Sequence, residues 1–316
     1  MKGFRHVLHG IAAAGLFLCA TTTALAADTL VRGDEKCMTC HQAVKADDIA
    51  GIAHTRHGVK ADGRTPSCTN CHGESDKHLA TGGADKPDRV FKGKAVSDPG
   101  VINGACLACH NGDAKRMHWA GSTHQARDVA CTNCHQVHTG HDKVRDKQSQ
   151  PEVCFACHKE QRTQINKPSH HPIPEGKMAC SDCHNPHGST GPKLMKRDNV
   201  NDTCYSCHME KRGPFVHTHE PVAEDCSNCH NPHGTTAENM LKARPPFLCH
   251  QCHTPHGGNV AQLAGQGQTT ALLSAVTGGK SGINYTMARG CVNCHTQVHG
   301  TNNPSTANPT PQFNFR

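Results

Sequence analysis

The sequence predicts a chain of short helices and loops with little regular secondary structure, wrapped around groups that the polypeptide does not itself supply. Hydrophobic residues make up only 35% of the 316 residues, and there are one Trp, two Tyr and eight Phe. A core built from side chains alone would be thin for a chain of this length. Gly and Pro, at 30 and 18 residues, interrupt most of the chain, and no strand-like alternation is seen.

Residues 1–26 are predicted to be a cleaved export signal. Lys2 and Arg5 give a positive start, Ile11–Ala20 is a short apolar run, and Ala24–Ala26 fits a cleavage site. Cys19 lies in the apolar run and is expected to leave with the signal. No other segment has the length and apolar character of a transmembrane helix. We therefore expect an exported protein that is not a helical membrane protein.

The 20 remaining cysteines all fall in ten CxxCH motifs, which we number 1 to 10 in chain order. The cysteine pairs are Cys37 and Cys40, Cys68 and Cys71, Cys106 and Cys109, Cys131 and Cys134, Cys154 and Cys157, Cys180 and Cys183, Cys204 and Cys207, Cys226 and Cys229, Cys249 and Cys252, and Cys291 and Cys294. The histidines that follow them are His41, His72, His110, His135, His158, His184, His208, His230, His253 and His295.

CxxCH is the attachment sequence of haem c, in which both thiols form thioethers and the following His ligates the iron. Zinc, iron–sulfur clusters and disulfides are the alternatives for paired cysteines, but none of them needs a His at one fixed offset. The sequence therefore predicts ten covalently bound haem c groups. These would also supply the missing apolar core.

An internal repeat selects the second axial ligands from the 16 His that are neither in the signal nor the last residue of a motif. Each repeat contains a motif, a middle His, a second motif and a trailing His. The middle histidines are His57, His124, His171, His219 and His256. The trailing histidines are His78, His138, His187, His233 and His299. With these residues, all ten irons are expected to have two His ligands.

Some of these assignments have alternatives. A trailing His three residues after a proximal His lies on the same face of a helical turn, so it is expected to bind a neighbouring haem. His170 is an alternative to His171, and His54 to His57. His256 has an alternative interpretation as a surface residue.

The repeat divides the chain after the signal into five dihaem units. Their ranges are 27–105, 106–153, 154–203, 204–248 and 249–316. The last unit contains a long loop, with a short helix expected near 269–276, and ends in a tail without ligands. Contacts between successive units predict an elongated molecule built around a chain of haems.

The formal charge of +7 is weak evidence for a nucleic-acid partner. Ten haems would add about 20 propionate charges, which many of the basic residues are expected to pair with. We therefore expect no nucleic acid among the partners.

The chain resembles the MtrA/DmsE-type periplasmic decahaem c-type cytochromes over essentially its whole length after the signal. Besides the ten motifs, the resemblance rests on three stretches. They are HGVKADGRTPSCTNCHGESDKH (57–78), SHHPIPEGKMACSDCHNPHGS (169–189) and CYSCHMEKRGPFVHTHEPVAEDCSNCHNPHG (204–234).

The resemblance implies an electron wire with bis-His haems and no catalytic residues, capable at most of weak direct metal reduction. Such proteins sit in an outer-membrane β-barrel of the MtrB type. They pass electrons between a periplasmic or inner-membrane cytochrome and an extracellular multihaem cytochrome or reductase, in extracellular respiration or Fe(II) oxidation. The implied location is the periplasm, in association with the outer membrane.

Two other functions are open at this point. A multihaem reductase would need one iron with an open position, and His256 is the weakest ligand assignment. A soluble periplasmic carrier would have the same haems without a barrel.

Overall fold

The computed structural model describes residues 35–41, 49–58, 65–93, 95–253, 291–293 and 295–302. In these ranges the longest helix is α5 (Pro99–His110), with 12 residues. The other α-helices are α1 (Glu35–His41), α3 (Cys68–His72), α4 (Asp76–Ala80), α6 (Gln150–Phe155), α7 (Lys159–Gln164), α8 (Cys180–Cys183), α9 (Val200–Tyr205) and α10 (Glu220–Glu224). The expected signal at 1–26 and the helix expected near 269–276 lie outside the described residues.

Single 3-10 turns make up most of the remaining regular structure in the described ranges. They are η1 (Ala50–His54), η2 (Gln125–Arg127), η3 (Cys131–Asn133), η4 (Lys143–Arg145), η5 (Pro192–Leu194), η6 (Met209–Lys211), η7 (Cys226–Asn228), η8 (Glu238–Met240), η9 (Cys249–Gln251) and η11 (Cys291–Asn293). The expected architecture of short helices and loops is confirmed. None of the described helices has the length and apolar character needed to span a lipid bilayer.

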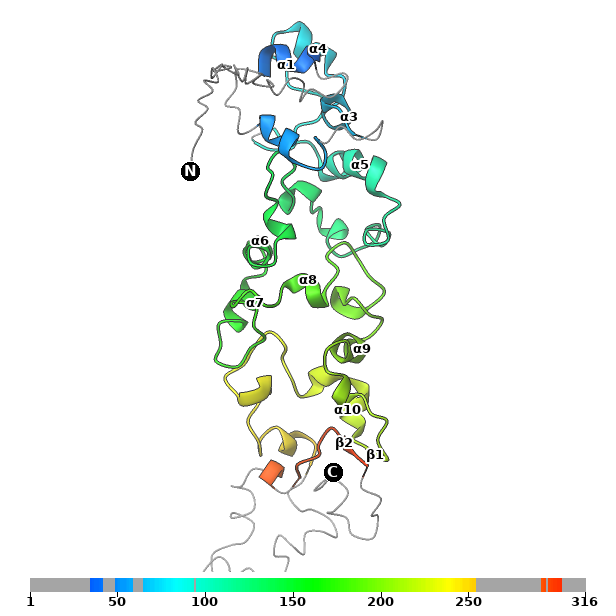
Figure 1. The fold of residues 1–316 in the computed structure, drawn as a ribbon, viewed down its shortest axis with the longest axis vertical. Coiled ribbons are helices and arrows are strands. Elements are labelled where there is room, and N and C mark those ends of the chain that lie inside the picture. The colour runs from blue at the N-terminus through cyan, green and yellow to red at the C-terminus, as the bar shows by residue number, and fades with distance from the viewer. Residues whose placement is uncertain are drawn as a thin grey trace, which may run out of the picture.

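The molecule is a column along which the chain advances in sequence order (Figure 1). Helices α1 and α4 lie at one end, α6 to α8 in the middle, and the short strands at the other end. The motifs are spaced along the sequence, so they are also distributed along the column.

The described part of the chain has a thin protein core. Its buried hydrophobic side chains are Ile102, Trp119, Ala130, Phe155, Ile165, Ala179, Met195 and Ala237. Four of these eight are alanine or methionine residues beside loops, so side-chain packing supplies little of the apolar burial that a chain of this size needs.

Segments from different units are joined by short antiparallel pairings that the sequence did not predict. Strand β1 (His217–Thr218) pairs with β2 (Gly300–Thr301), and Ser169 forms an isolated bridge with Thr235. Two-residue strands leave no alternation to detect. These pairings place a middle-His segment of one unit beside the trailing-His segment of the next.

Candidate haem centres

Each of motifs 1 to 9, which the structure describes in full, folds as one tight turn that places its first cysteine and its histidine on the same side of the chain. In motifs 4 to 10 the His N–H donates to the carbonyl of the first Cys, at 2.8 to 3.1 Å. Because this bond closes one helical turn, the proximal His is positioned by its own motif.

Buried amide side chains connect the two motifs of a unit. Asn103, in α5 just before motif 3, accepts a hydrogen bond from the Cys131 N–H of motif 4 at 2.8 Å. Asn201, in α9 before motif 7, likewise accepts from the Cys226 N–H of motif 8 at 2.7 Å. Gln150, in α6 before motif 5, accepts in the same way from the Ser181 N–H of motif 6 at 2.9 Å. All three amides are buried. They therefore fix where the second motif begins relative to the first.

The first cysteines of the paired motifs consequently lie side by side. The hydrogen bond between the Cys106 and Cys131 thiols raises the pKa of Cys106 and lowers that of Cys131. The same hydrogen bond joins Cys154 with Cys180 and Cys204 with Cys226. Groups attached to the two motifs of one unit would therefore be neighbours.

Nine of the ten proximal histidines face a middle or trailing histidine predicted from the repeat. The ring centres of these pairs are 5.9 to 6.3 Å apart. The pairs are His41 with His78, His72 with His138, His110 with His57, His135 with His187, His158 with His124, His184 with His233, His208 with His171, His230 with His299, and His253 with His219.

This separation fits a metal atom between two imidazoles. Bonds of about 2 Å from the metal to each nitrogen place the ring centres about 6 Å apart. Rings in van der Waals contact would be closer, at about 4.5 Å for the tightest aromatic pairs. The pairs therefore have the geometry of two axial ligands on opposite sides of a haem iron.

Hydrogen bonds at Nδ1 also favour the interpretation of these histidines as iron ligands. In seven of these histidines, Nδ1 bonds a backbone carbonyl at 2.7 to 3.1 Å. They are His72, His78, His124, His171, His184, His219 and His230. Because the carbonyl accepts a hydrogen bond from Nδ1–H, the proton stays on Nδ1 and the lone pair of Nε2 is available for a metal.

Burial also favours the neutral imidazole, which is the form that binds a metal. Burial, followed by the charge of His135, lowers the pKa of His187 to about 4. Burial is likewise the largest cause that lowers the pKa of His184 and of His233. These rings are neutral near pH 7.

The middle histidines link successive units through a repeated contact. His124 Nδ1 donates to the carbonyl of Pro186, immediately before His187. His171 bonds Pro232, immediately before His233, in the same way. In the last unit, His219 bonds Val298, immediately before His299. In each case the middle His and the trailing His belong to different facing pairs, so the hydrogen bond connects two neighbouring pairs.

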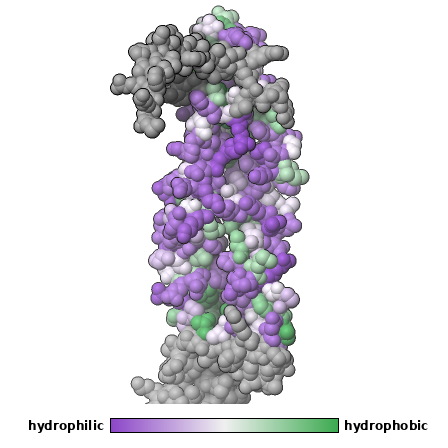
Figure 2. All heavy atoms as spheres, in the orientation of Figure 1, coloured by the Kyte–Doolittle hydropathy of each residue, from purple (hydrophilic) through white to green (hydrophobic). Residues whose placement is uncertain are grey.

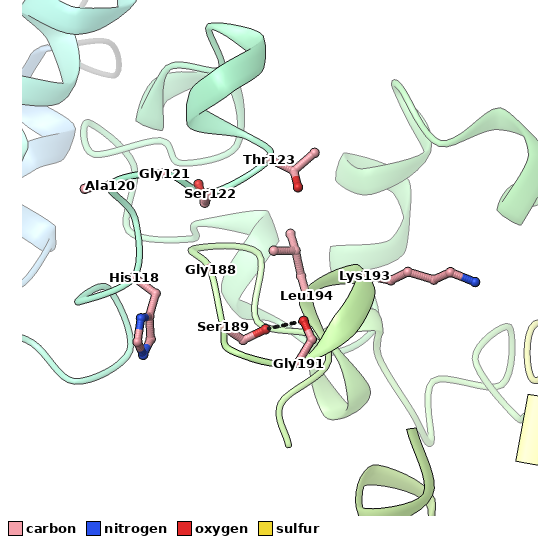
Figure 3. Close-up of a pocket in the computed structure, with 10 residues that line it drawn as sticks. All are labelled: His118, Ala120, Gly121, Ser122, Thr123, Gly188, Ser189, Gly191, Lys193 and Leu194. Atoms are coloured by element: carbon pink, nitrogen blue, oxygen red, sulfur yellow. Dashed lines mark hydrogen bonds between the residues drawn. The ribbon is translucent and has the colours of Figure 1, made fainter. Parts of the chain in front are cut away.

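Figure 3 shows a different contact between two units, where segment 118–123 meets the loop 188–194. Gly188 follows His187 and has a φ of +113°, and a Cβ there would lie 2.0 Å from the His118 carbonyl oxygen. Only glycine allows this close approach. Ser189 Oγ donates to the Gly191 carbonyl at 3.4 Å within the same loop. The loop thereby holds His187 opposite His135.

Three sequence assignments cannot be placed in the same way. His256 and Cys294 lie outside the described residues. His295 is described, but none of the nine pairs includes it. Among the described residues no cluster of three or more His, Cys, Asp or Glu forms a metal site of its own.

The structure also separates the adjacent candidates. His170 uses both ring nitrogens, Nδ1 toward the Lys167 carbonyl and Nε2 toward Glu175 at 3.2 Å, whereas His171 faces His208. His57 faces His110, and His54 belongs to none of the nine pairs.

The sequence analysis did not identify the buried amides Asn103, Gln150 and Asn201, nor the carboxylate Asp142, which contacts His135. A signal was available for the amides, because each lies three or four residues before an odd-numbered motif. Nothing in the local sequence distinguishes Asp142 from other loop carboxylates.

Turn-forming CxxCH motifs with facing imidazoles, arranged along a column, define a multihaem c-type cytochrome. Two family models agree, the doubled CXXCH motif over residues 170–213 and 219–258 and the NrfB-like cytochrome c-type protein over residues 68–149. The chain is 41% identical over 279 residues to the multiheme cytochrome MtrA of Shewanella baltica, covering 87% of this chain and 80% of that protein. The chain therefore belongs to the MtrA family of multihaem cytochromes, as its sequence resemblance predicted.

More distant relatives share part of the chain. The cytochrome c-type protein NrfB of Escherichia coli O6:H1 is 28% identical over 174 residues, covering 50% of this chain and 88% of that protein. The high-molecular-weight cytochrome c of Nitratidesulfovibrio vulgaris is 26% identical over 166 residues, or 52% of this chain and 28% of that protein. These relatives are also named as c-type cytochromes. Covalently bound haem c and electron transfer follow for this chain from its MtrA family membership and its doubled CXXCH motifs.

Proposed function

We propose that this protein is a decahaem conduit that carries electrons between periplasmic cytochromes and an extracellular cytochrome or acceptor. It would do so from within an outer-membrane β-barrel of the MtrB type, in extracellular respiration or Fe(II) oxidation. The nine facing His pairs, which follow one another along the column in sequence order, are the observation that supports this function most directly.

The proposal assigns two axial histidines to every iron. Haem c, when bound, supplies a one-electron couple at each motif. The two histidines of each of the nine pairs would hold the iron from both sides, which would leave no open coordination site there for a substrate. We assign His256 to His295, because they are the predicted ligands that remain after the nine pairs. On this assignment the protein is not an enzyme.

Contacts between neighbouring pairs support continuous transfer along the column. The first-cysteine contacts join the two centres within a unit. The bonds from His124, His171 and His219 join centres across unit boundaries. These two kinds of contact alternate along the chain, so the haems form one series.

The hydrophilic surface and the family membership support the proposed location in a barrel and the proposed electron-transfer partners. The face in Figure 2 is mostly hydrophilic over the described residues, which suits the polar interior of an outer-membrane barrel. Membership of the MtrA family supports electron-transfer partners, and we propose those that the sequence resemblance implied. They are an MtrB-type barrel, an extracellular multihaem cytochrome or reductase, and a periplasmic or inner-membrane cytochrome. Nucleic acid is not among the proposed partners.

Proteoliposomes with a trapped redox dye test the function. Barrel plus cytochrome should reduce the dye when reductant is added outside, and barrel alone should not. His233→Ala removes one assigned axial ligand and should slow dye reduction, whereas His170→Ala should leave the rate unchanged.

Dye reduction that is equally fast without the cytochrome would refute the conduit. Failure of this chain to bind the barrel would instead favour the soluble carrier.

A further inference from the structure

One axial histidine has a hydrogen-bond partner unlike the carbonyls described above. His135 Nδ1 donates to the carboxylate oxygen Oδ2 of Asp142 at 2.7 Å. The ring of His135 stacks opposite His187, with centres 6.0 Å apart and planes 10° apart. A carboxylate therefore lies directly behind one ligand of the motif 4 centre.

Asp142 is held in place by more than this one bond. Its other oxygen, Oδ1, accepts the Gln136 N–H at 3.2 Å, and its carbonyl accepts the Arg145 N–H at 2.9 Å. The Asp142 side chain is only 15% exposed. In the part of the chain that the structure describes, no Lys or Arg side chain lies within ion-pair distance of it. Its negative charge is thus fixed, largely buried and not neutralised.

The backbone after motif 4 explains why a carboxylate occupies this place. After motifs 6 and 8, a longer loop returns to form the bridges His184–Met195 and His230–Leu241. Those loops present the Lys193 and Asn239 carbonyls to the proximal rings. After motif 4 the chain instead turns into η4, for which Asp142 is the N-cap residue. The side chain of Asp142 thereby replaces the missing loop carbonyl.

We propose that Asp142 is a positioning residue that makes the haem of Cys131 and Cys134 the lowest-potential centre of the chain. A carboxylate acceptor draws the Nδ1 proton more strongly than a neutral carbonyl, so it makes the His135 imidazole a more basic ligand. A more basic ligand and a nearby buried negative charge both stabilise the ferric state. This haem is therefore the last of the series to accept an electron.

This inference rests on the haem ligation in the proposed function, and it does not depend on the barrel or on the direction of electron flow. Its consequence for the series is specific. Electrons that pass between the haems of motifs 3 and 5 cross their highest free-energy step at motif 4.

Asp142→Asn in the full-length holoprotein is the direct test. Asn keeps the shape and an oxygen acceptor but converts the partner into a neutral amide, like the carbonyls behind seven of the other paired histidines. In a potentiometric titration followed by visible and EPR spectra, the lowest-potential component should shift upward. We expect at least a tenfold change in its reduction equilibrium constant, which is about 59 mV for one electron. The EPR signature of one low-spin haem should change with it.

Two variants serve as matched controls. Glu210 lies 3.7 Å from Nδ1 of the proximal His208, beyond hydrogen-bond distance, and both side chains are more than half exposed. Glu210→Gln should leave every component unchanged. Asp146→Asn makes the same charge change four residues from Asp142, at a carboxylate that bonds Ser149. It should also leave the lowest component in place.

An unchanged lowest component in Asp142→Asn would overturn the inference, and so would an equal shift in either control. If Asp142→Asn fails to accumulate with all its haems, Asp142→Glu is the alternative test. This variant retains a carboxylate, so the reduction potential of the lowest component must stay low. The haem count by mass and the low-spin spectra report separately on the ligation. The inference can therefore fail while the proposed function stands.

Discussion

Individual histidines are distinguished by what their two ring nitrogens contact. Adjacent residues His170 and His171 have the same side chain, but the backbone turns them in different directions. His170 bonds Lys167 and Glu175, while His171 donates Nδ1–H to the Pro232 carbonyl and faces His208. Only the ring of His171 is positioned with its second nitrogen available for an iron.

We predict that His171→Ala opens one iron and that His170→Ala opens none. Loss of the distal imidazole should convert one low-spin haem to a five-coordinate, high-spin state. EPR of the oxidised His171→Ala protein should show a high-spin ferric signal amounting to one haem per chain. The His170→Ala protein, altered at the neighbouring position, should retain the wild-type spectrum. A high-spin signal in His170→Ala alone would reverse the assignment.

Among the elements, helix α5 does more than carry motif 3. Its buried residue Asn103 donates from Nδ2 to the Val129 carbonyl at 3.1 Å and accepts the Cys131 N–H at 2.8 Å. These two bonds satisfy the backbone on both sides of Ala130, at the start of η3. The helix of the first motif therefore holds the start of the second.

We predict that Asn103→Ala destabilises the second unit by about 1–3 kcal/mol, because it leaves a part-buried N–H and a part-buried carbonyl without these partners. Thermal unfolding and limited proteolysis of the holoprotein should show the loss. Asn111→Ala, at the exposed C-cap of the same helix, should change stability by less than about 0.5 kcal/mol. Equal effects of the two substitutions would show that the buried hydrogen bonds contribute nothing specific.

For the whole molecule, the thin side-chain core means that the haems supply the apolar interior. The eight buried hydrophobic residues in the described ranges cannot offset the conformational entropy of so long a chain. Each central unit also depends on its neighbours, since its ligand pairs join histidines from different units. Loss of one haem therefore affects more than one unit.

We predict ten haems per chain and a strong dependence of the fold on each central haem. Mass spectrometry should show the holoprotein about 6 kDa above the polypeptide, at roughly 0.6 kDa per attached haem. The double substitution Cys180→Ala and Cys183→Ala should leave a protein that is degraded or truncated in the periplasm. A mass gain equivalent to eight haems or fewer would contradict the count. Normal accumulation of a rigid nine-haem variant would contradict the dependence.

Features that depend on local chemistry could be predicted from the amino-acid sequence. Thioether attachment and the proximal ligand lie within five consecutive residues, so motifs such as Cys131–His135 can be read directly. Composition predicted the thin core, and the repeat selected the candidate distal histidines, although it did not pair them.

Which imidazoles face each other, and which groups lie behind them, depends on the folded arrangement of distant segments. His124 bonds a carbonyl 62 residues away, and His219 bonds one 79 residues away. Partners at that separation are brought together by short bridges and loop lengths that leave no local pattern. The contact of Asp142 with His135 depends in the same way on where the chain turns after motif 4. A distal ligand is defined by position in space, and spacing along the chain does not specify that position.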